Sequence, residues 1–168
     1  MDVIIDIQFL KGTRNQYIPK EVDVVAVNGD FSGHWMVKSP IPLHYLSENI
    51  QKQNSWLKQH RHRLDYFDGE VTLKSVKYIL RELSKSVRKI YVRGNDKWLA
   101  LYKFIPRQII NLEYDQNCPS FNKLSSDTYC IHHAVKPSYK NYSCALNNAY
   151  KLKAYLAPSV VLQENHFL

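Results

Sequence analysis

The N-terminal part of the chain alternates apolar runs with short polar turns, a pattern typical of adjacent β-strands. Residues 3–10 form an apolar run that Asp6 and Gln8 interrupt. Because side chains two apart in a strand share a face, both polar side chains should lie on one face of a buried strand. Residues 21–27 and 31–37 predict two further strands, and the Asn-Gly-Asp sequence between them is a strong hairpin signal.

Helical and strand patterns alternate through the rest of the chain. Apolar residues spaced three and four apart predict an amphipathic helix at residues 73–87 and a final helix at residues 145–156. The other predicted elements are a helix with a loop at residues 43–60, strands at 90–92 and 108–112, and short helices at 97–104 and after Cys118. This order predicts an α/β fold with a mixed five-stranded sheet, three antiparallel strands then parallel strands, flanked by helices.

The length fits one domain. The chain has 168 residues, 45% of them hydrophobic, which is enough for a single core. We expect one domain over residues 1–158 and a C-terminal tail over residues 159–168. No apolar run approaches the ~20 residues that cross a bilayer, and no signal peptide pattern follows Met1. The sequence therefore predicts an intracellular protein, cytoplasmic or nuclear, without a membrane partner.

The excess of positive charge favours one class of partner. Lys and Arg number 23 against 15 Asp and Glu, a formal net charge of +8, which favours an anionic partner such as nucleic acid. The alternative is a solvated basic face. The basic residues that would form a phosphate-binding surface are Arg61, Arg63, Arg81, Lys85, Arg88, Lys89 and Arg93. The aromatic residues on which bases would stack are Trp35, Trp56, Tyr66, Phe67, Tyr91 and Trp98.

Cysteine and histidine spacing indicates a metal site. Cys130, His133 and Cys144 form a Cys-x2-His-x10-Cys pattern, and sulfur and imidazole ligands suit zinc. The alternative is two buried cysteines and a surface histidine. Glu21 and His132 are both candidates for a fourth ligand. The remaining cysteine, Cys118, is expected in the core.

Three segments resemble the motifs of the DEDDh-type 3′–5′ exonucleases, which have a ribonuclease H-like fold. They are Ile4-Ile5-Asp6-Ile7-Gln8, Val92-Arg93-Gly94-Asn95 and Ser143-Cys144-Ala145-Leu146-Asn147-Asn148-Ala149, and the resemblance covers about residues 3–156. Those enzymes use two metal ions held by four acidic residues, with a histidine as general base. Here Asp6 matches the first acid, whereas Gln8, Asn148 and Ser143 stand at the second acid, the last acid and the base. Asp96 is the only candidate for the middle acid. Uncharged side chains cannot balance two divalent cations, so we expect a degenerate site without two-metal catalysis.

The cysteine and histidine pattern is similar to the MAEL domain of Maelstrom, a degenerate relative of these exonucleases. In that domain a Glu-Cys-His-Cys set replaces the active site, and the resemblance implies that Glu21, Cys130, His133 and Cys144 hold a structural zinc ion. The HMG box that usually precedes the Maelstrom domain is absent from this sequence. A separate lineage of stand-alone domains, from a mobile element or a virus, is equally compatible.

The resemblance leads to three functional hypotheses. The first is a zinc-stabilised pseudoenzyme that binds single-stranded nucleic acid, RNA more than DNA, in small-RNA or mobile-element biology. The second is a weak single-strand ribonuclease that does not use the two-metal mechanism. The third is a scaffold whose basic surface contacts an acidic protein partner.

Overall fold

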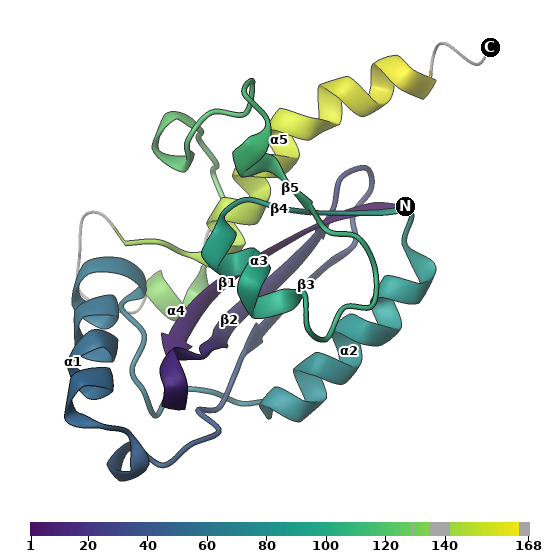
Figure 1. Ribbon diagram of the computed structural model, residues 1–168. Coiled ribbons are helices and arrows are strands. Elements are labelled where there is room, and N and C mark those ends of the chain that lie inside the picture. The colour runs from purple at the N-terminus through teal and green to yellow at the C-terminus, as the bar shows by residue number, and fades with distance from the viewer. Residues whose placement is uncertain (129, 135–141, 165–168) are drawn as a thin grey trace.

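One mixed sheet organises the molecule (Figure 1). The computed structural model describes residues 1–128, 130–134 and 142–164. The strands are β1 (Asp2–Lys11), β2 (Tyr17–Ala26), β3 (Ser32–Met36), β4 (Lys89–Val92) and β5 (Ile110–Asn111). Their order is β3-β2-β1-β4-β5; β1, β2 and β3 pair antiparallel, while β4 and β5 add in parallel. This confirms the predicted α/β fold and its ribonuclease H-like layout.

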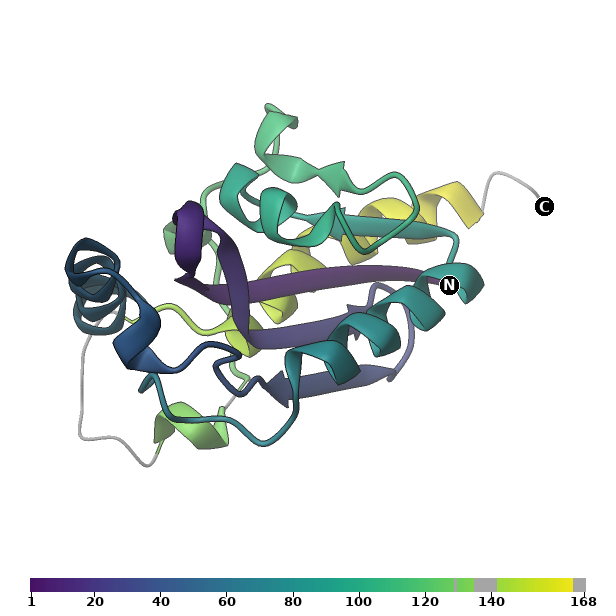
Figure 2. The same cartoon turned by 60° about the horizontal axis from the view of Figure 1, so that its bottom comes forward.

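Helices cover both faces of the sheet (Figure 2). They are α1 (Glu48–Leu57), α2 (Leu73–Ser86), α3 (Asn95–Leu101), α4 (Ile131–Ala134) and α5 (Ala145–Glu164). Side chains of β1 alternate between two cores: Ile5 packs with α2 and α3, whereas Ile4 packs with α5. Both cores bury β1, which explains its nearly continuous apolar sequence. The alternation places Asp6 and Gln8 on the α5 face.

Helix α1 is hydrogen-bonded to the end of β1, and it leads into a short turn that carries His62. Ser47 caps the start of α1 by accepting a hydrogen bond from the Ile50 N–H at 3.2 Å. Within α1, the Asn54 side chain accepts from the Lys11 N–H at 2.7 Å and donates to the Lys11 carbonyl at 2.9 Å. A π-helical turn, Lys58–His62, continues from α1 and ends at Arg63, whose φ is 59°. These contacts set the position of the His62 carbonyl.

Several element boundaries differ from the predicted ones. Strand β2 begins at Tyr17 and β5 spans only Ile110–Asn111. Helix α3 begins earlier than predicted because Gly94, with φ 126°, turns the chain directly after β4. Helix α5 continues to Glu164, beyond the predicted end at residue 156 and into the predicted tail, whose residues 165–168 lie outside the described residues. Across the described part of the chain, no helix combines the length and apolar character needed to cross a membrane.

Candidate metal centre

Two acidic side chains of β2 lie on the sheet face that α5 covers. Glu21 is opposite Gln8 in the β1–β2 ladder, and Asp23 is opposite Asp6. Directly opposed residues share a face. The Ala145 N–H at the start of α5 donates to Glu21 Oε1, which places the carboxylate beneath the first turn of this helix. Both acids are fully buried.

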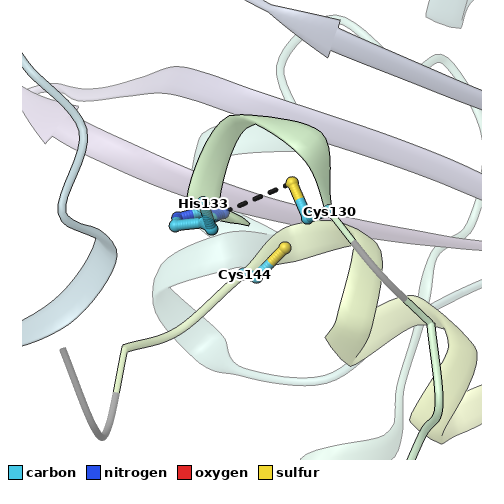
Figure 3. Close-up of side chains that lie close together, drawn as sticks. All are labelled: Cys130, His133 and Cys144. Atoms are coloured by element: carbon cyan, nitrogen blue, oxygen red, sulfur yellow. Dashed lines mark hydrogen bonds between the residues drawn. The ribbon is translucent and has the colours of Figure 1, made fainter. Parts of the chain in front are cut away.

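Cys130, His133 and Cys144 converge at the same place (Figure 3). Cys130 precedes α4, His133 lies within α4, and Cys144 precedes α5. All three residues are buried, and their ligand atoms lie within 4.8 Å of one another. Tetrahedral bonds of about 2.0–2.3 Å to a single zinc ion place ligand atoms about 3.3–3.8 Å apart, so a small inward shift of these side chains would let them share one ion. The predicted pattern therefore forms a compact group that could hold a metal ion.

The neighbours of His133 orient its ring toward the two cysteines. His133 Nε2 is 2.7 Å from the His62 carbonyl oxygen, and Nδ1 is 3.3 Å from Cys130 Sγ. A carbonyl only accepts, so Nε2 carries a proton, and Nδ1 is the ring nitrogen that faces Cys130. The Tyr142 ring stacks on the imidazole at a centroid distance of 4.4 Å. A hydrogen bond to the distal nitrogen is the usual support of a metal-binding histidine.

Of the two candidates for a fourth ligand, Glu21 lies beside the group. Its Oε1 accepts from the Cys144 thiol at 3.5 Å, and its Oε2 is 3.9 Å from His133 Nε2. Glu21 Oε2 is buried without a hydrogen-bond partner, as a carboxylate oxygen reserved for a cation would be. The His132 ring instead stacks on His34, with centroids 5.3 Å apart. The three buried donors, two sulfurs and one imidazole, are ligand types that suit zinc.

Burial and mutual contact shift the protonation of this group. Burial raises the pKa of Glu21 to about 7. A hydrogen bond from the Cys144 thiol lowers the pKa of Cys130 to about 3, and the same contact raises the pKa of Cys144. This contact therefore favours deprotonation of Cys130 over deprotonation of Cys144. Binding of a zinc ion would displace the remaining protons, which makes the affinity pH-dependent.

The buried position of Asp23 makes ionisation of its carboxyl group unfavourable. Burial, together with the nearby charges of Glu21 and Asp6, raises its pKa to about 8. Neither carboxylate oxygen has a hydrogen-bond partner, and the His34 ring stands beside the group with its Nδ1 3.8 Å from Oδ1. A positive charge in the adjacent ligand group would reduce this cost.

The degenerate exonuclease positions form a second group on the same face. Asp6 is fully buried, and its Oδ1 is 2.6 Å from Lys97 Nζ of α3. Asn148 Nδ2 of α5 donates to Asp6 Oδ2 at 3.1 Å. A lysine ammonium thus balances the charge of the single matched acid. Asp96, the candidate for the middle acid, accepts instead from the Tyr17 hydroxyl at 3.3 Å.

Gln8 and Ser143 complete this group. The Gln8 side chain is buried and its Nε2 has no hydrogen-bond partner. Ser143 is half-buried, and its backbone N–H donates to the Arg61 carbonyl at 2.7 Å. Neither side chain carries the negative charge that Mg²⁺ or Mn²⁺ prefers in its ligands. The geometry therefore brings the predicted positions together without assembling a set of metal-binding acids there.

Comparison with known proteins finds no family model that matches the chain and no curated protein sequence that matches it.

The structure distributes the predicted basic residues over several places. Arg61 and Arg93 line one pocket at the ends of β1 and β4, near the degenerate positions. Arg88 and Lys89 lie at the opposite end, where β4 begins beside the start of β1, and Arg88 pairs with Asp2. The predicted residues near the C-terminal end of α2 are Arg81 and Lys85. Arg63 follows the π-helical turn.

The predicted aromatic residues also separate by environment. Trp35 and Trp98 pack against the core between the sheet and α2, and Tyr91 packs against the core beneath α5. Trp56 and Phe67 are exposed. The Tyr66 hydroxyl donates to the Ile41 carbonyl. Cys118 is buried beneath α5, which confirms its predicted place in the core.

Lys97 and Asp23 are site residues that sequence reasoning missed. The sequence predicts Lys97 only as the first residue of a short helix, and no local pattern ties it to Asp6. Asp23 does have a signal, because Glu21 and Asp23 alternate within an otherwise apolar strand. Such alternation places two carboxyl groups on one buried face, and it resembles the spacing of Asp6 and Gln8 in β1.

Proposed function

We propose that this protein is a zinc-stabilised, catalytically degenerate exonuclease-like domain that binds single-stranded nucleic acid, RNA in preference to DNA. The closed ligand group carries the proposal. Cys130, His133 and Cys144 are buried together, and Glu21 lies beside them, with its Oε2 3.9 Å from His133 Nε2. With Glu21 as the fourth ligand, the site would have no open position for a substrate or water, which is typical of a structural site rather than a catalytic one.

The environment of Asp6 supports the loss of two-metal catalysis. Lys97 and Asn148 both donate to the Asp6 carboxylate. A metal ion bound to Asp6 would have to displace the lysine ammonium, and an amide at Asn148 adds no compensating charge. These contacts favour a pseudoenzyme over a metal-dependent nuclease, and they accord with the proposed kinship to the MAEL domain.

Charge and exposed aromatic groups support a nucleic-acid partner. The formal net charge is +8. At the end of α1 the Arg61 guanidinium lies 5.8 Å from the ring centroid of Trp56, whose side chain is half exposed. Single strands bind where basic side chains follow the backbone and aromatic rings stack with bases.

Metal content tests the zinc site. Mass spectrometry of untagged protein should find one zinc ion per chain, and Cys130→Ser should lose it. Glu21→Gln, which keeps an oxygen for the Ala145 N–H but removes the charge, should lower zinc retention. Cys118→Ser is the matched control, because Cys118 is buried elsewhere, and it should retain zinc. A parent protein without zinc, or full zinc content in Cys130→Ser, would contradict the site.

RNA binding tests the function itself. Fluorescence anisotropy with a single-stranded oligoribonucleotide should show binding at low salt. The logarithm of the association constant should fall linearly with the logarithm of salt concentration, by about 0.7 per phosphate contact. No binding at low salt would exclude the nucleic-acid function and favour the protein scaffold. Cleavage of the oligonucleotide without added divalent metal would favour the ribonuclease.

A further inference from the structure

A pocket of about 500 Å³ opens on the sheet face opposite the candidate metal centre. It lies between the turn that joins β1 to β2, the start of α2, and α3 with the residues just after it. Part of its wall belongs to the apolar core beneath α2 and α3, including Leu73, Ala100 and Phe104. None of the candidate metal ligands and none of the degenerate exonuclease positions lines it. We call this site the turn pocket.

The charged side chains of the turn pocket are all positive. They are Arg14, Lys77 and Lys103, and no Asp or Glu lines the pocket. In the described part of the chain, none of the three forms an ion pair. Asp96 accepts a hydrogen bond from the hydroxyl of Tyr17, which lines the pocket, but Asp96 itself lies outside the lining. A ligand in the turn pocket would therefore meet three cations that have no paired carboxylate.

Aliphatic side chains form the apolar part of the wall. Ile18 and Ala100 are buried there, whereas Ile41, Leu73 and Leu99 are only partly buried and leave apolar surface open. Transfer of an apolar side chain from water onto such a surface is favourable. The wall therefore suits a ligand that has an aliphatic part beside its negative charge.

The aromatic rings that line the pocket offer little free surface for stacking. The Tyr102 ring stacks on Trp98, with centroids 4.6 Å apart, and the Lys11 ammonium lies 3.6 Å from the Tyr17 ring centroid. Phe104 is buried. Nucleobases of a single strand bind by stacking on open aromatic faces. The lining of the turn pocket thus favours an aliphatic anion over a nucleotide.

The turn places Arg14 beside the pocket in an unfavourable backbone conformation. Arg14 and Asn15 both have positive φ, of 57° and 56°, and the Gln16 N–H donates to the Thr13 carbonyl at 3.3 Å. This is the arrangement of a type I′ turn, in which Asn followed by Gly is the favoured pair. Arginine rarely adopts left-handed backbone, and such exceptions cluster where a side chain serves binding.

We propose that the turn pocket binds an acidic peptide segment of a partner protein, with an aliphatic side chain next to its carboxylates. The carboxylates would pair with Arg14, Lys77 and Lys103, and the aliphatic side chain would pack against Leu73 and Leu99. A volume of about 500 Å³ lies within the range of about 300–1,000 Å³ typical of ligand sites. The proposal goes beyond the nucleic-acid function and requires neither a nucleic acid nor a metal ion.

Selection from a random peptide library displayed on phage tests the chemistry of the occupant. Selection on the purified full-length chain should enrich peptides that combine Asp or Glu with Leu, Ile or Val. In a synthetic copy of an enriched peptide, replacement of the acids by their amides should lower the affinity about fivefold or more, and so should replacement of the aliphatic residue by Ser. No enrichment, or enrichment of peptides without acidic residues, would overturn the proposal.

Arg14→Asn is the most informative variant, because stability and affinity should change differently. Asn adopts left-handed backbone more readily than arginine, so the melting temperature should stay constant or rise. The affinity for the enriched peptide, measured by fluorescence anisotropy, should fall about two- to fivefold because one ion pair is lost. Lys103→Gln should have a similar effect on affinity, since this side chain is exposed and lines the pocket.

Lys74→Gln is the matched control. Lys74 is an exposed cation of α2 that does not line the pocket, so the affinity should remain at the parent value. Full affinity in the double variant Arg14→Asn with Lys103→Gln would overturn the proposal. An equal loss of affinity in Lys74→Gln would also overturn it, because net charge alone would then explain binding.

An NMR titration locates the peptide and separates this proposal from the nucleic-acid function. The peptide should shift the amide signals of residues 13–16 and of the start of α2, and it should leave those of α5 in place. Excess single-stranded oligoribonucleotide should not displace it. Shifts of residues 13–16 by the oligonucleotide alone would assign the turn pocket to nucleic acid and overturn the proposal. A protein that binds the peptide but no oligonucleotide at low salt would instead overturn the proposed function and support the turn pocket.

Discussion

Asp6 keeps its place in the core through two donors that come from elements far away in the sequence. Burial raises the pKa of Asp6, and the positive charge of Lys97 opposes that rise. The Asn148 amide donates to the second carboxylate oxygen. Because an unpaired buried carboxylate is expensive, Lys97 and Asp6 should be energetically coupled.

Lys97→Met tests this coupling. Removing the ammonium leaves a buried carboxylate without its cation, so the free energy of unfolding should fall by about 3–5 kcal/mol. The double variant Asp6→Asn with Lys97→Met removes both charges and should recover most of the loss. Urea denaturation of the parent, both single variants and the double variant gives the coupling energy. A double variant as unstable as Lys97→Met would show that lysine acts through packing alone.

Residue identity explains which site residues the sequence could predict. Cysteine and histidine have few roles in proteins, so the spacing of Cys130, His133 and Cys144 by itself indicates a metal site. Lys97 is one of many lysines, and its contact with Asp6 spans 91 positions. Such a contact depends on how α3 packs beside β1, which no local pattern encodes.

At the scale of elements, periodicity predicts the long helices and the buried strands well. Helix α2 occupies Leu73–Ser86, close to the predicted 73–87, because a complete apolar stripe defines it. The single-turn α4 and the π-helical turn Lys58–His62 are not predicted. Elements this short contain too few residues to show a repeating apolar pattern, yet they carry His133 and the His62 carbonyl. The sequence therefore predicts least well the two short elements that bring the candidate metal ligands together.

The ion pair between Asp2 and Arg88 joins the starts of β1 and β4, and it gives a pH prediction. The Arg88 guanidinium donates to both Asp2 oxygens at 2.8 Å and holds the pKa of this carboxyl below its ordinary value. A lowered pKa contributes stability above the unfolded pKa of about 3.9, and that contribution is lost as pH falls through the folded pKa.

Arg88→Gln should therefore destabilise the protein in a pH-dependent way. Because the Arg88 side chain is 60% exposed, solvent screening limits the expected loss at pH 7 to about 1 kcal/mol. The loss should shrink as pH falls below about 4, the ordinary pKa of an aspartate, and through the lowered pKa of folded Asp2. Urea denaturation at about pH 7 and near pH 3.5 measures both values. An equal loss at both pH values would contradict the role of the ion pair.

At the scale of the whole molecule, the two faces of the sheet differ in kind. The face beneath α2 and α3 has an extended apolar core, whereas the face beneath the start of α5 buries the carboxyl groups of Asp6, Glu21 and Asp23. The first face is stabilised by apolar burial, which needs no ligand. The second also has an apolar core beneath the middle of α5, but beneath the start of α5 it depends on polar contacts and, by our proposal, on zinc.

Removal of zinc should therefore lower the local stability of some segments and leave that of others unchanged. After chelation, hydrogen exchange should accelerate in α4 and the first turns of α5, where His133 and Ala145 contact the site. Amides of β1 and β2, which are hydrogen-bonded within the buried centre of the sheet, should remain protected. Hydrogen–deuterium exchange with mass spectrometry resolves these segments. No change in α4 and α5 after complete zinc loss would contradict a structural role for the ion.

The contact between Glu21 and Cys144 spans 123 positions of the chain, and this has a consequence for biosynthesis. β1 and β2 leave the ribosome before Cys144 and α5, and chains begin folding from the N-terminus during synthesis. Until then the acidic side chains of the nascent hairpin remain hydrated, where ionised carboxylates are most stable. The pairing of β1 with β2 can therefore precede assembly of the site, and by our proposal zinc is captured only after Cys144 and α5 have emerged.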